Sequence, residues 1–578
     1  MKKKFLSICL TTFLLSIFAQ NMNETLFSVG DDSVSVSEFI NTFTRNNSLE
    51  KATKKEVRDY LELYINFKLK VKDGLDSQID TTPTFQRELA SYRSQSAKSY
   101  LVDKEVSDRL IEEAVERSKL MVRASHILIR SPQDATPKDS LIAYNKALDI
   151  RKKIVSGNIS FPEAAVQFSD DLSAKDERLP NGRMQYGNKG DLGYFSTFDL
   201  IYPFESAAYN TPVGSYSMPF RTQFGYHIIW VQDKQPIVPK ISISQILLID
   251  STAHAGNMTP EVKETLALID KALKQGEDFE TLAEQYTEDP SSKGKGGLID
   301  PITYKNRPGD FIKNCITLKN DQISKPFPSV VGWHIVKLNE LIIPEANEEE
   351  KRYSLVSRIQ RDSRSTKSVE SLVEKLKKEY RYSEVNKNAA FSLLSNAFEK
   401  EMNIPSVTEL LAIEGIEKLN PLATFANQNI TLHSFLQYLD RFKGSERNST
   451  ANHFLETQYN LFLKDNIIKY EYENLENKYP DYKELISEYH HGMILFEMNN
   501  EKIWSESLKD SANLEAFYEK SISNYLNNEG VPKPLAEIRS IVLTDYQHEL
   551  EKLWLNQLME RYPVWINEEL FNSILINK

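Results

Sequence analysis

The sequence predicts an α+β protein of several domains, and three observations lead to that prediction. The chain has 578 residues, which is too many for a single hydrophobic core. Short apolar strands with helical segments between them form a passage that occurs twice: ASHILI at Ala124 and FGYHII at Phe224 recur as ISQILL at Ile243 and VGWHIV at Val331. The regions on either side have apolar residues at helical spacing. We therefore expect two small α+β domains, flanked by mainly helical N- and C-terminal regions that pack together.

The first residues are typical of a secretory signal. Lys2, Lys3 and Lys4 precede an apolar run from Phe5 to about Ala19. That run is shorter than the roughly 20 residues that a membrane-spanning helix needs. We expect residues 1–19 to be a signal peptide that is cleaved, with a retained anchor as the alternative.

Composition excludes several classes of partner and cofactor. Hydrophobic residues make up 40% of the chain and charged residues 26%, as in globular proteins. The net charge of −11 repels phosphate backbones, so we expect no nucleic-acid partner. Cys315 is the only cysteine beyond the signal, which leaves no internal disulfide, and the nine histidines do not fall into metal-ligand spacing. No glycine-rich ATP loop is present, so we expect neither ATP, nor a metal, nor another cofactor.

Five segments follow one another along the chain. We expect the signal peptide at 1–19, an N-terminal helical region at 20–118, a first motif domain at 119–235, a second at 238–342, and a mainly helical C-terminal region at 343–578. The segment QPIVPK at Gln235 contains two prolines and predicts a short, stiff linker between the motif domains.

A weaker repeat links the two flanking regions. The strand-turn-helix pattern LFSVGDDSVSVSEF near the N-terminus is matched by LATFANQNITLHSFL at Leu422, displaced by 396 residues, with chance matching as the alternative. The segment YPVWINEELF from Tyr562 predicts a strand that returns to a core.

The motif strings of the first copy are ASHILI, FSDDLSAK, GDLGYF, YPFE and FGYH. Together they resemble the parvulin family of peptidyl-prolyl isomerases, and the resemblance covers both copies. The whole layout resembles that of periplasmic chaperones of the SurA type. The resemblance implies small α+β domains that rotate X-Pro peptide bonds, a reaction that needs neither nucleophile nor cofactor.

The resemblance also implies the site of the first copy. The proline ring would lie against Leu192, Leu200 and Phe204. The residues at the floor of the pocket would be His126, Asp171, Thr222 and His227, with the two histidines hydrogen-bonded to each other. Our hypothesis is that the Asp171 carboxylate disfavours negative charge on the substrate carbonyl oxygen. The alternative for the histidines is a purely structural pair that satisfies its own hydrogen bonds.

The second copy departs from this pattern. Its counterparts are Gln245, Asp289 and His334, and GGLIDPI replaces GDLGYF. Glutamine can hydrogen-bond to His334, so we expect the fold to survive. Because the first histidine and the walls of the pocket are changed, we expect isomerase activity to be weak or absent. The first copy also carries about 11 extra residues, in a polar loop near Pro180 that we expect to modify access to its pocket.

The resulting function is a periplasmic peptidyl-prolyl isomerase and chaperone. Its partners would be unfolded or nascent exported polypeptides, and the resemblance alone points to outer-membrane proteins. One alternative is a non-catalytic holdase whose parvulin domains bind clients or act as spacers. Another is an assembly factor dedicated to one secreted partner.

Overall fold

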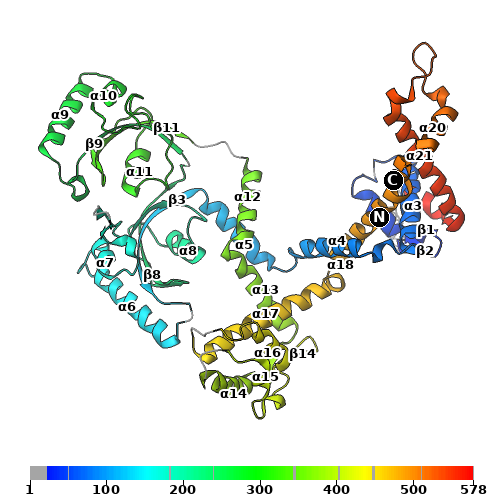
Figure 1. Cartoon of the computed structure of the whole chain (residues 1–578), viewed down its shortest axis with the longest axis horizontal. Helices are drawn as coiled ribbons and strands as arrows, with labels where there is room; N and C mark the ends of the chain where they lie inside the picture. The colour runs from blue at the N-terminus through cyan, green and yellow to red at the C-terminus, as the bar shows by residue number, and fades with distance from the viewer. Residues whose placement is uncertain are drawn as a thin grey trace, which may run out of the picture. The chain divides into compact units, whose positions relative to one another are not determined.

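The protein divides into two compact units. The computed structural model describes residues 22–49, 51–133, 135–180, 184–238, 240–342, 347–400, 404–445, 449–509 and 511–576. One unit is formed by the chain up to Lys98 together with the chain from Glu473 onward, and the other by Ser99–Tyr472. Figure 1 shows the elements of both. The predicted signal peptide lies outside the described residues.

The first unit combines a small sheet with helices from both ends of the chain. Its strands are β1 (Thr25–Val29), β2 (Asp32–Ser35) and β15 (Val564–Ile566). Its helices are α2 (Val36–Thr44), α3 (Lys54–Asp76), η1 (Ile79–Thr81), α4 (Pro83–Ala97), α18 (Pro480–Asn499), η6 (Asn500–Trp504), α19 (Ser505–Lys509), α20 (Ser511–Lys520), η7 (Ile522–Asn524), α21 (Leu535–Arg561) and α22 (Glu568–Ile576).

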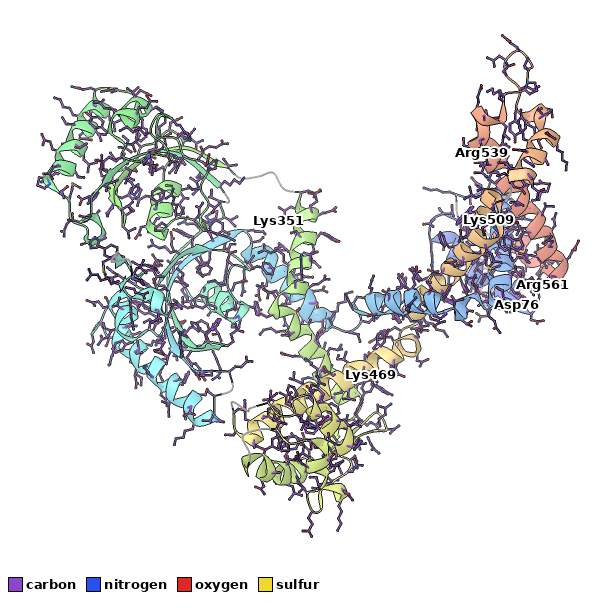
Figure 2. The ribbon with its side chains drawn as sticks, in the orientation of Figure 1. Asp76, Lys351, Lys469, Lys509, Arg539 and Arg561 are labelled. Carbon is purple, nitrogen blue, oxygen red and sulfur yellow. The ribbon has the colours of Figure 1, made fainter. Side chains whose placement is uncertain are left out.

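Strand β15 closes this unit by pairing antiparallel with β1, which confirms the predicted returning strand. Side-chain hydrogen bonds join the same two parts of the chain. Asp73 accepts from Trp554 Nε1 at 3.1 Å and from Arg561 Nη1 at 2.9 Å, and Tyr562 Oη donates to Asp76 at 2.7 Å. Arg561 and Asp76 are labelled in Figure 2. The two ends of the chain therefore form one core, as expected.

The second unit begins with α5 (Lys104–Arg117) and contains both motif copies. The first copy consists of β3 (Leu120–Arg130), α6 (Pro137–Val155), α7 (Phe161–Phe168), η2 (Leu172–Ala174), β4 (Glu177–Arg178), β5 (Met184–Gln185), β6 (Asp191–Phe195), α8 (Tyr202–Asn210), β7 (Phe220–Thr222) and β8 (Gly225–Pro236). The second consists of β9 (Lys240–Ile249), η3 (Ala253–Ala255), α9 (Pro260–Lys274), α10 (Phe279–Tyr286), α11 (Gly309–Ile316), β10 (Phe327–Pro328) and β11 (Gly332–Ile342).

The rest of the second unit is mainly helical. It consists of α12 (Glu348–Arg361), η4 (Ser363–Ser365), α13 (Thr366–Glu379), β12 (Ser383–Glu384), α14 (Lys387–Lys400), α15 (Val407–Leu411), η5 (Ile416–Lys418), β13 (Ala423–Phe425), β14 (Gln428–Ile430), α16 (Leu432–Asp440) and α17 (Ala451–Lys478), whose last residues pass into the first unit.

Each motif copy is a layered α+β domain, as predicted. In the first, the sheet has the order β6-β3-β8-β7. One face packs against α6 and α7 through Ile127, Ile129 and Ile228, and the other against α8. Because side chains alternate between the faces of a strand, His126 and His227 lie on the α8 face. In the second copy α9 and α10 cover one face and α11 the other.

The repeat between the flanking regions is present in the fold. Helices α2 and α16 are displaced by 396 residues at both ends, and each follows a hairpin, β1-β2 or β13-β14, that belongs to a three-stranded sheet. The strand-turn-helix pattern therefore marks a real structural repeat.

The division into two units cuts across the flanking regions predicted at 20–118 and 343–578, whose boundaries stay a prediction. Helix α5 and the chain from 347 to Tyr472 belong to the same unit as the motif copies, not to the flanking core. A buried ionic cluster joins these helices to the first copy. Glu205 of α8 has 0% exposure and accepts from Arg117 Nη1 of α5 at 3.0 Å and from Arg364 Nη2 of η4 at 2.8 Å. These contacts fasten the first copy to the helices that precede and follow the copies.

Replacing Glu205 by glutamine will destabilise the second unit. Arg364 has a fully buried side chain and pairs with both Glu205 and Asp362, so loss of the Glu205 charge leaves this buried cation with Asp362 as its remaining ionic partner. We expect the free energy of unfolding to fall by about 1.5–3 kcal/mol, the usual worth of a hydrogen bond to a charged group. Thermal unfolding followed by circular dichroism measures it. The control is Glu116→Gln, which removes an exposed pair with Lys119 worth less than about 1 kcal/mol. Equal unfolding of the two variants would contradict the structural role of the cluster.

Candidate active site

The predicted residues of the first copy meet on the α8 face of its sheet. His126 comes from β3 and His227 from the neighbouring strand β8, where Leu128 is paired with His227 and His126 with Ile229. The two imidazoles stack with centroids 5.6 Å apart, and their Nδ1 atoms are 3.4 Å apart. Both side chains are buried, with exposures of 7% and 4%.

A continuous row of hydrogen bonds joins Asp171, His126, His227 and Thr222. His126 Nε2 lies 2.8 Å from Asp171 Oδ2, and His227 Nε2 lies 2.8 Å from Thr222 Oγ1. An ionised carboxylate can only accept, so His126 donates from Nε2 and accepts at Nδ1. His227 must then donate from Nδ1 and accept the Thr222 hydroxyl at Nε2. Thr222 in turn accepts from the Phe224 amide at 3.1 Å. Every donor in the row therefore has one acceptor, with both histidines neutral.

The electrostatics of the row agree with this assignment. Burial acts to raise the pKa of the Asp171 carboxyl, but hydrogen bonds from Ser173 and His126 outweigh it and hold the pKa below its ordinary value. Burial lowers the pKa of His126 against the opposing effect of Asp171. Burial and then the neighbouring His126 lower the pKa of His227 to about 3. The floor of the site thus carries one negative charge, at Asp171, and no positive charge.

Leu192, Leu200 and Phe204, which were predicted to hold the proline ring, belong to one apolar cluster on the same face. Phe204 is buried, and its ring meets the edges of both histidines at centroid distances of 5.6 and 5.4 Å. Leu192 and Leu200 are half-buried. The structure therefore brings all seven predicted residues of the first copy to one place.

Phe220 is a site residue that the motif comparison missed. Its ring stacks on His227 at 5.5 Å and meets Phe204 edge-on at 5.7 Å. A signal was present in the sequence, because Phe327 stands 107 residues later, at the same displacement as the closing histidine of the second copy. Phe327 stacks on His334 in the same way, at 5.6 Å.

A glycine in each copy allows the chain to approach the backbone of the first site residue. A Cβ at Gly190, whose φ is +85°, would lie 2.6 Å from the carbonyl oxygen of His126. At Gly297, whose φ is +75°, a Cβ would lie 2.5 Å from the carbonyl oxygen of Gln245. The two copies therefore share the backbone arrangement beside the first site residue.

The second copy keeps only part of the row. Gln245 Nε2 donates to Asp289 at 2.7 Å, and His334 Nε2 lies 2.8 Å from Ser329 Oγ. The predicted hydrogen bond between Gln245 and His334 was wrong, because the amide is engaged by Asp289. His334 Nδ1 is buried with no hydrogen-bond partner in the described part of the chain. Burial and then Arg307 lower the pKa of His334 to about 4.

The walls of the second copy also differ. Arg307 stands 107 residues after Leu200, and its guanidinium lies 5.5 Å from the centre of the Phe311 ring. Phe311 in turn corresponds to Phe204. In the second copy, the guanidinium of Arg307 over the Phe311 ring therefore replaces the apolar side chain that Leu200 provides in the first.

Comparison with known proteins agrees with this geometry. The rotamase family, described as the PPIC-type PPIase domain, matches residues 126–233 and 247–340. The chain carries two PPIC-type peptidyl-prolyl isomerase domains. Chaperone SurA of Hydrogenovibrio crunogenus is 25% identical over 287 residues, covering 49% of this chain and 60% of the relative. Chaperone SurA of Pseudoalteromonas translucida is 29% identical over 261 residues, covering 44% and 56%. The chain thus spans less than two thirds of the length of these relatives.

The peptidylprolyl isomerase PrsA of Bacillus anthracis is one of the solved structures that match part of this chain. It is 30% identical and covers 24% of this chain and 59% of its own, with a TM-score of 0.16.

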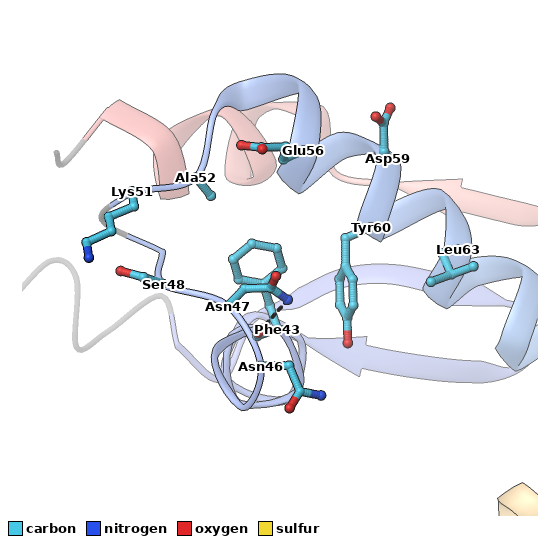
Figure 3. Close-up of a pocket in the computed structure, with 10 residues that line it drawn as sticks. All are labelled: Phe43, Asn46, Asn47, Ser48, Lys51, Ala52, Glu56, Asp59, Tyr60 and Leu63. Carbon is cyan, nitrogen blue, oxygen red and sulfur yellow. Dashed lines mark hydrogen bonds between the residues drawn. The ribbon is translucent and has the colours of Figure 1, made fainter.

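An open hollow of about 620 Å³ lies in the first unit. Phe43, Tyr60 and Leu63 line it beside Asn47 and Lys51 (Figure 3). Leu63 has 63% exposure, so the hollow offers apolar surface to solvent. It contains none of the predicted site residues.

The described residues hold neither a metal-binding cluster nor a membrane-spanning helix. Among them no group of three or more histidine, cysteine or acidic side chains is placed to hold a metal ion. Within the same ranges, none of the helices combines the length and the apolar character that crossing a membrane requires.

His227 of the first rotamase domain will stay neutral down to pH 5. Imidazole nitrogen spectra should show neutral His227 with a proton on Nδ1 from pH 7 to pH 5, because its pKa is lowered to about 3. Because the pKa of His227 is about 3 in the folded protein and about 6.5 in the unfolded chain, unfolding at a pH between these values takes up a proton. The stability that this residue provides is complete above pH 6.5 and falls by about 1.4 kcal/mol per pH unit below it. A cationic His227 at pH 6 would contradict the assigned row.

Gln245→His will stabilise the second rotamase domain. The new imidazole can donate to Asp289 and form a hydrogen bond with the unpartnered Nδ1 of His334, as His126 does with His227 in the first domain. Satisfying a buried polar group is worth about 1 kcal/mol. Denaturant unfolding measures the change, with Gln245→Leu as the variant that cannot make either bond. If Gln245→His were no more stable than the unmodified protein, His334 Nδ1 would not be an unmet donor.

Proposed function

We propose that the chain is a peptidyl-prolyl isomerase that acts through its first rotamase domain, and a chaperone for exported polypeptides in the periplasm. The observation that carries the catalytic part is the neutral pair His126 and His227 beneath the wall of Leu192, Leu200 and Phe204. We assign His126, Asp171, Thr222 and His227 to the catalytic floor and the three apolar residues to proline binding. Gln245, Asp289 and His334 are their degenerate counterparts.

The reaction is rotation about an amide bond. The planar amide is stabilised by resonance, so rotation has a barrier of about 18–20 kcal/mol. Resonance places negative charge on the carbonyl oxygen, whereas the twisted amide has less charge separation. A dry apolar pocket therefore favours the twisted state over the planar one, and only such a difference accelerates the reaction. A thousandfold acceleration requires about 4 kcal/mol.

The charges of the floor act in the same direction. A cation near the substrate carbonyl oxygen would strengthen amide resonance, and both histidines are held neutral by burial. The carboxylate of Asp171 disfavours negative charge on that oxygen and so weakens resonance. The row of hydrogen bonds supports this role in two ways. The hydrogen bond from His126 fixes the position of the Asp171 carboxylate, and the lowered pKa of Asp171 keeps it ionised.

The surroundings of the pocket favour a polypeptide substrate. Three exposed apolar side chains lie within two residues of Asp171, Phe220 or Thr222 in the sequence, namely Leu172, Met218 and Phe224, with exposures of 70%, 54% and 53%. They offer contacts to chain segments on either side of a proline. The hollow beside Leu63 offers apolar surface for unfolded chains in the first unit. The relatives named Chaperone SurA support a chaperone role. We extend this role to exported clients, outer-membrane proteins among them.

Leu200→Arg tests the catalytic assignment. It places in the first domain the residue type that the second domain has at Arg307, and we expect kcat/KM for a proline peptide to fall at least tenfold, which corresponds to about 1.4 kcal/mol. The matched control is Arg307→Leu, which should leave turnover unchanged. An isomerase assay on the full chain measures both variants.

The same variants separate catalysis from client holding. Leu200→Arg should still suppress aggregation of an unfolded outer-membrane protein, because the hollow of the first unit is unaltered. Unchanged turnover in Leu200→Arg would remove the first domain as the catalyst. Turnover lost with Arg307→Leu instead would assign catalysis to the second domain.

A further inference from the structure

The two half-buried walls of the proline pocket each follow an aspartate. Leu192 comes directly after Asp191, and Leu200 directly after Asp199. Both carboxylates shape the loops that carry the walls. Asp191 Oδ1 accepts from the Gly193 amide at 2.9 Å, which closes a turn over Leu192. The place of each wall therefore depends on what holds the neighbouring carboxylate.

Asp199 is held by the second rotamase domain. Its Oδ2 accepts from the Ser196 amide at 2.8 Å and from the Tyr304 hydroxyl at 3.1 Å. Lys305 forms an ion pair with the other carboxylate oxygen. Tyr304 is buried at 7% exposure, so its hydroxyl is a fixed donor, whereas the Lys305 side chain is half exposed. The loop that precedes Leu200 is thus tied to the second domain by two side chains.

Asp191 is linked to the second domain through Arg123. The guanidinium of Arg123 binds Asp191 through Nη2 and Asp310 through Nη1, both at 2.6 Å. Arg123 has 6% exposure, and Asp310 lies in the first turn of α11. The approach is close, because a Cβ at Gly309 would lie 2.4 Å from Arg123 Nε. One buried cation therefore joins the wall loop of the first domain to a helix of the second.

An apolar contact lies between these two polar ones. Met121 and Tyr194 of the first domain belong to the same buried cluster as Ile302 and Phe311 of the second. Met121 and Tyr194 are buried, with exposures of 0% and 2%. The hydrogen bonds at Asp191 and Asp199 therefore border a continuous core.

We propose that the second rotamase domain positions the proline pocket of the first, with Arg123, Tyr304, Lys305 and Asp310 as positioning residues. This inference rests on the proposed isomerase function of the first domain. The second domain holds the loops of Leu192 and Leu200 in the arrangement that receives the proline ring. Its own altered site then needs no turnover to serve the reaction.

The expected kinetic effect follows from this role. When the ties are removed, the two walls occupy the receptive arrangement for only a fraction of the time. The apparent affinity for substrate falls by that fraction, whereas bound substrate still meets the same floor. KM should therefore rise while kcat changes little.

The test is the double variant Lys305→Ala and Asp310→Ala in the full chain. We expect KM for a proline peptide to rise about three- to tenfold with kcat within about twofold. Amide hydrogen exchange should speed up at residues 191–200 and stay unchanged in β3 and β8. The pair Lys305→Arg and Asp310→Glu should restore KM. The matched control is Lys313→Ala with Asp300→Ala, two exposed charges of the same domain.

The two measurements keep this inference separate from the proposed function. Unchanged KM and unchanged exchange in the double variant would overturn the positioning role. Faster exchange throughout the first domain would overturn it as well, because it would show general loss of stability. An unmodified chain without isomerase activity would refute the proposed function, and with it this role, even if exchange at residues 191–200 still responded.

Discussion

The arrangement of the second unit depends on the buried carboxylate of Glu205. It accepts hydrogen bonds from Arg117, Arg364, Thr197 and the Phe198 amide, and no part of it reaches solvent. A buried ionic cluster adds little net stability compared with apolar packing, but a partner left alone is costly, so such a cluster selects one arrangement over others. The residue before it, Phe204, forms the wall above the two histidines. One turn of α8 therefore carries both the attachment to the helices and a surface of the pocket.

The two rotamase domains show which parts of this fold belong to architecture and which to chemistry. The glycine beside the first site residue, the aromatic ring on the second histidine and the hydroxyl partner of that histidine are present in both, as Gly190 and Gly297, Phe220 and Phe327, and Thr222 and Ser329. The first histidine and one apolar wall are not shared, because Gln245 replaces His126 and Arg307 replaces Leu200. Glu205 itself corresponds to Ile312, which is buried in an apolar core. The second domain thus keeps its shape without the charged attachment.

Much of the site could be predicted from the sequence because its residues lie within motifs. His126, Asp171 and His227 are close in space because strand pairing and one loop bring them together, and the strings that carry them were recognisable. Phe220 was missed because its string is short, although its displacement matched. The hydrogen bond of Gln245 was mispredicted because residue identity does not decide which of two nearby polar groups a side-chain amide meets. The attachment of the first domain to the helices that follow the copies includes the pair Glu205 and Arg364, a contact over 159 residues that leaves no periodic signal.

The extra loop of the first domain has a consequence for how the domain pair moves. Tyr186, at the end of that loop, stacks on His254 of the second domain with ring centroids 4.3 Å apart. Arg123 and the loop of Asp199 make separate contacts with the same domain. A single contact permits two bodies to swivel about it, whereas contacts from three segments of the chain oppose rotation about any one of them. A pulling force that a bound polypeptide exerts on the first domain is therefore transmitted to both domains together, so the pair resists it as one mechanical element.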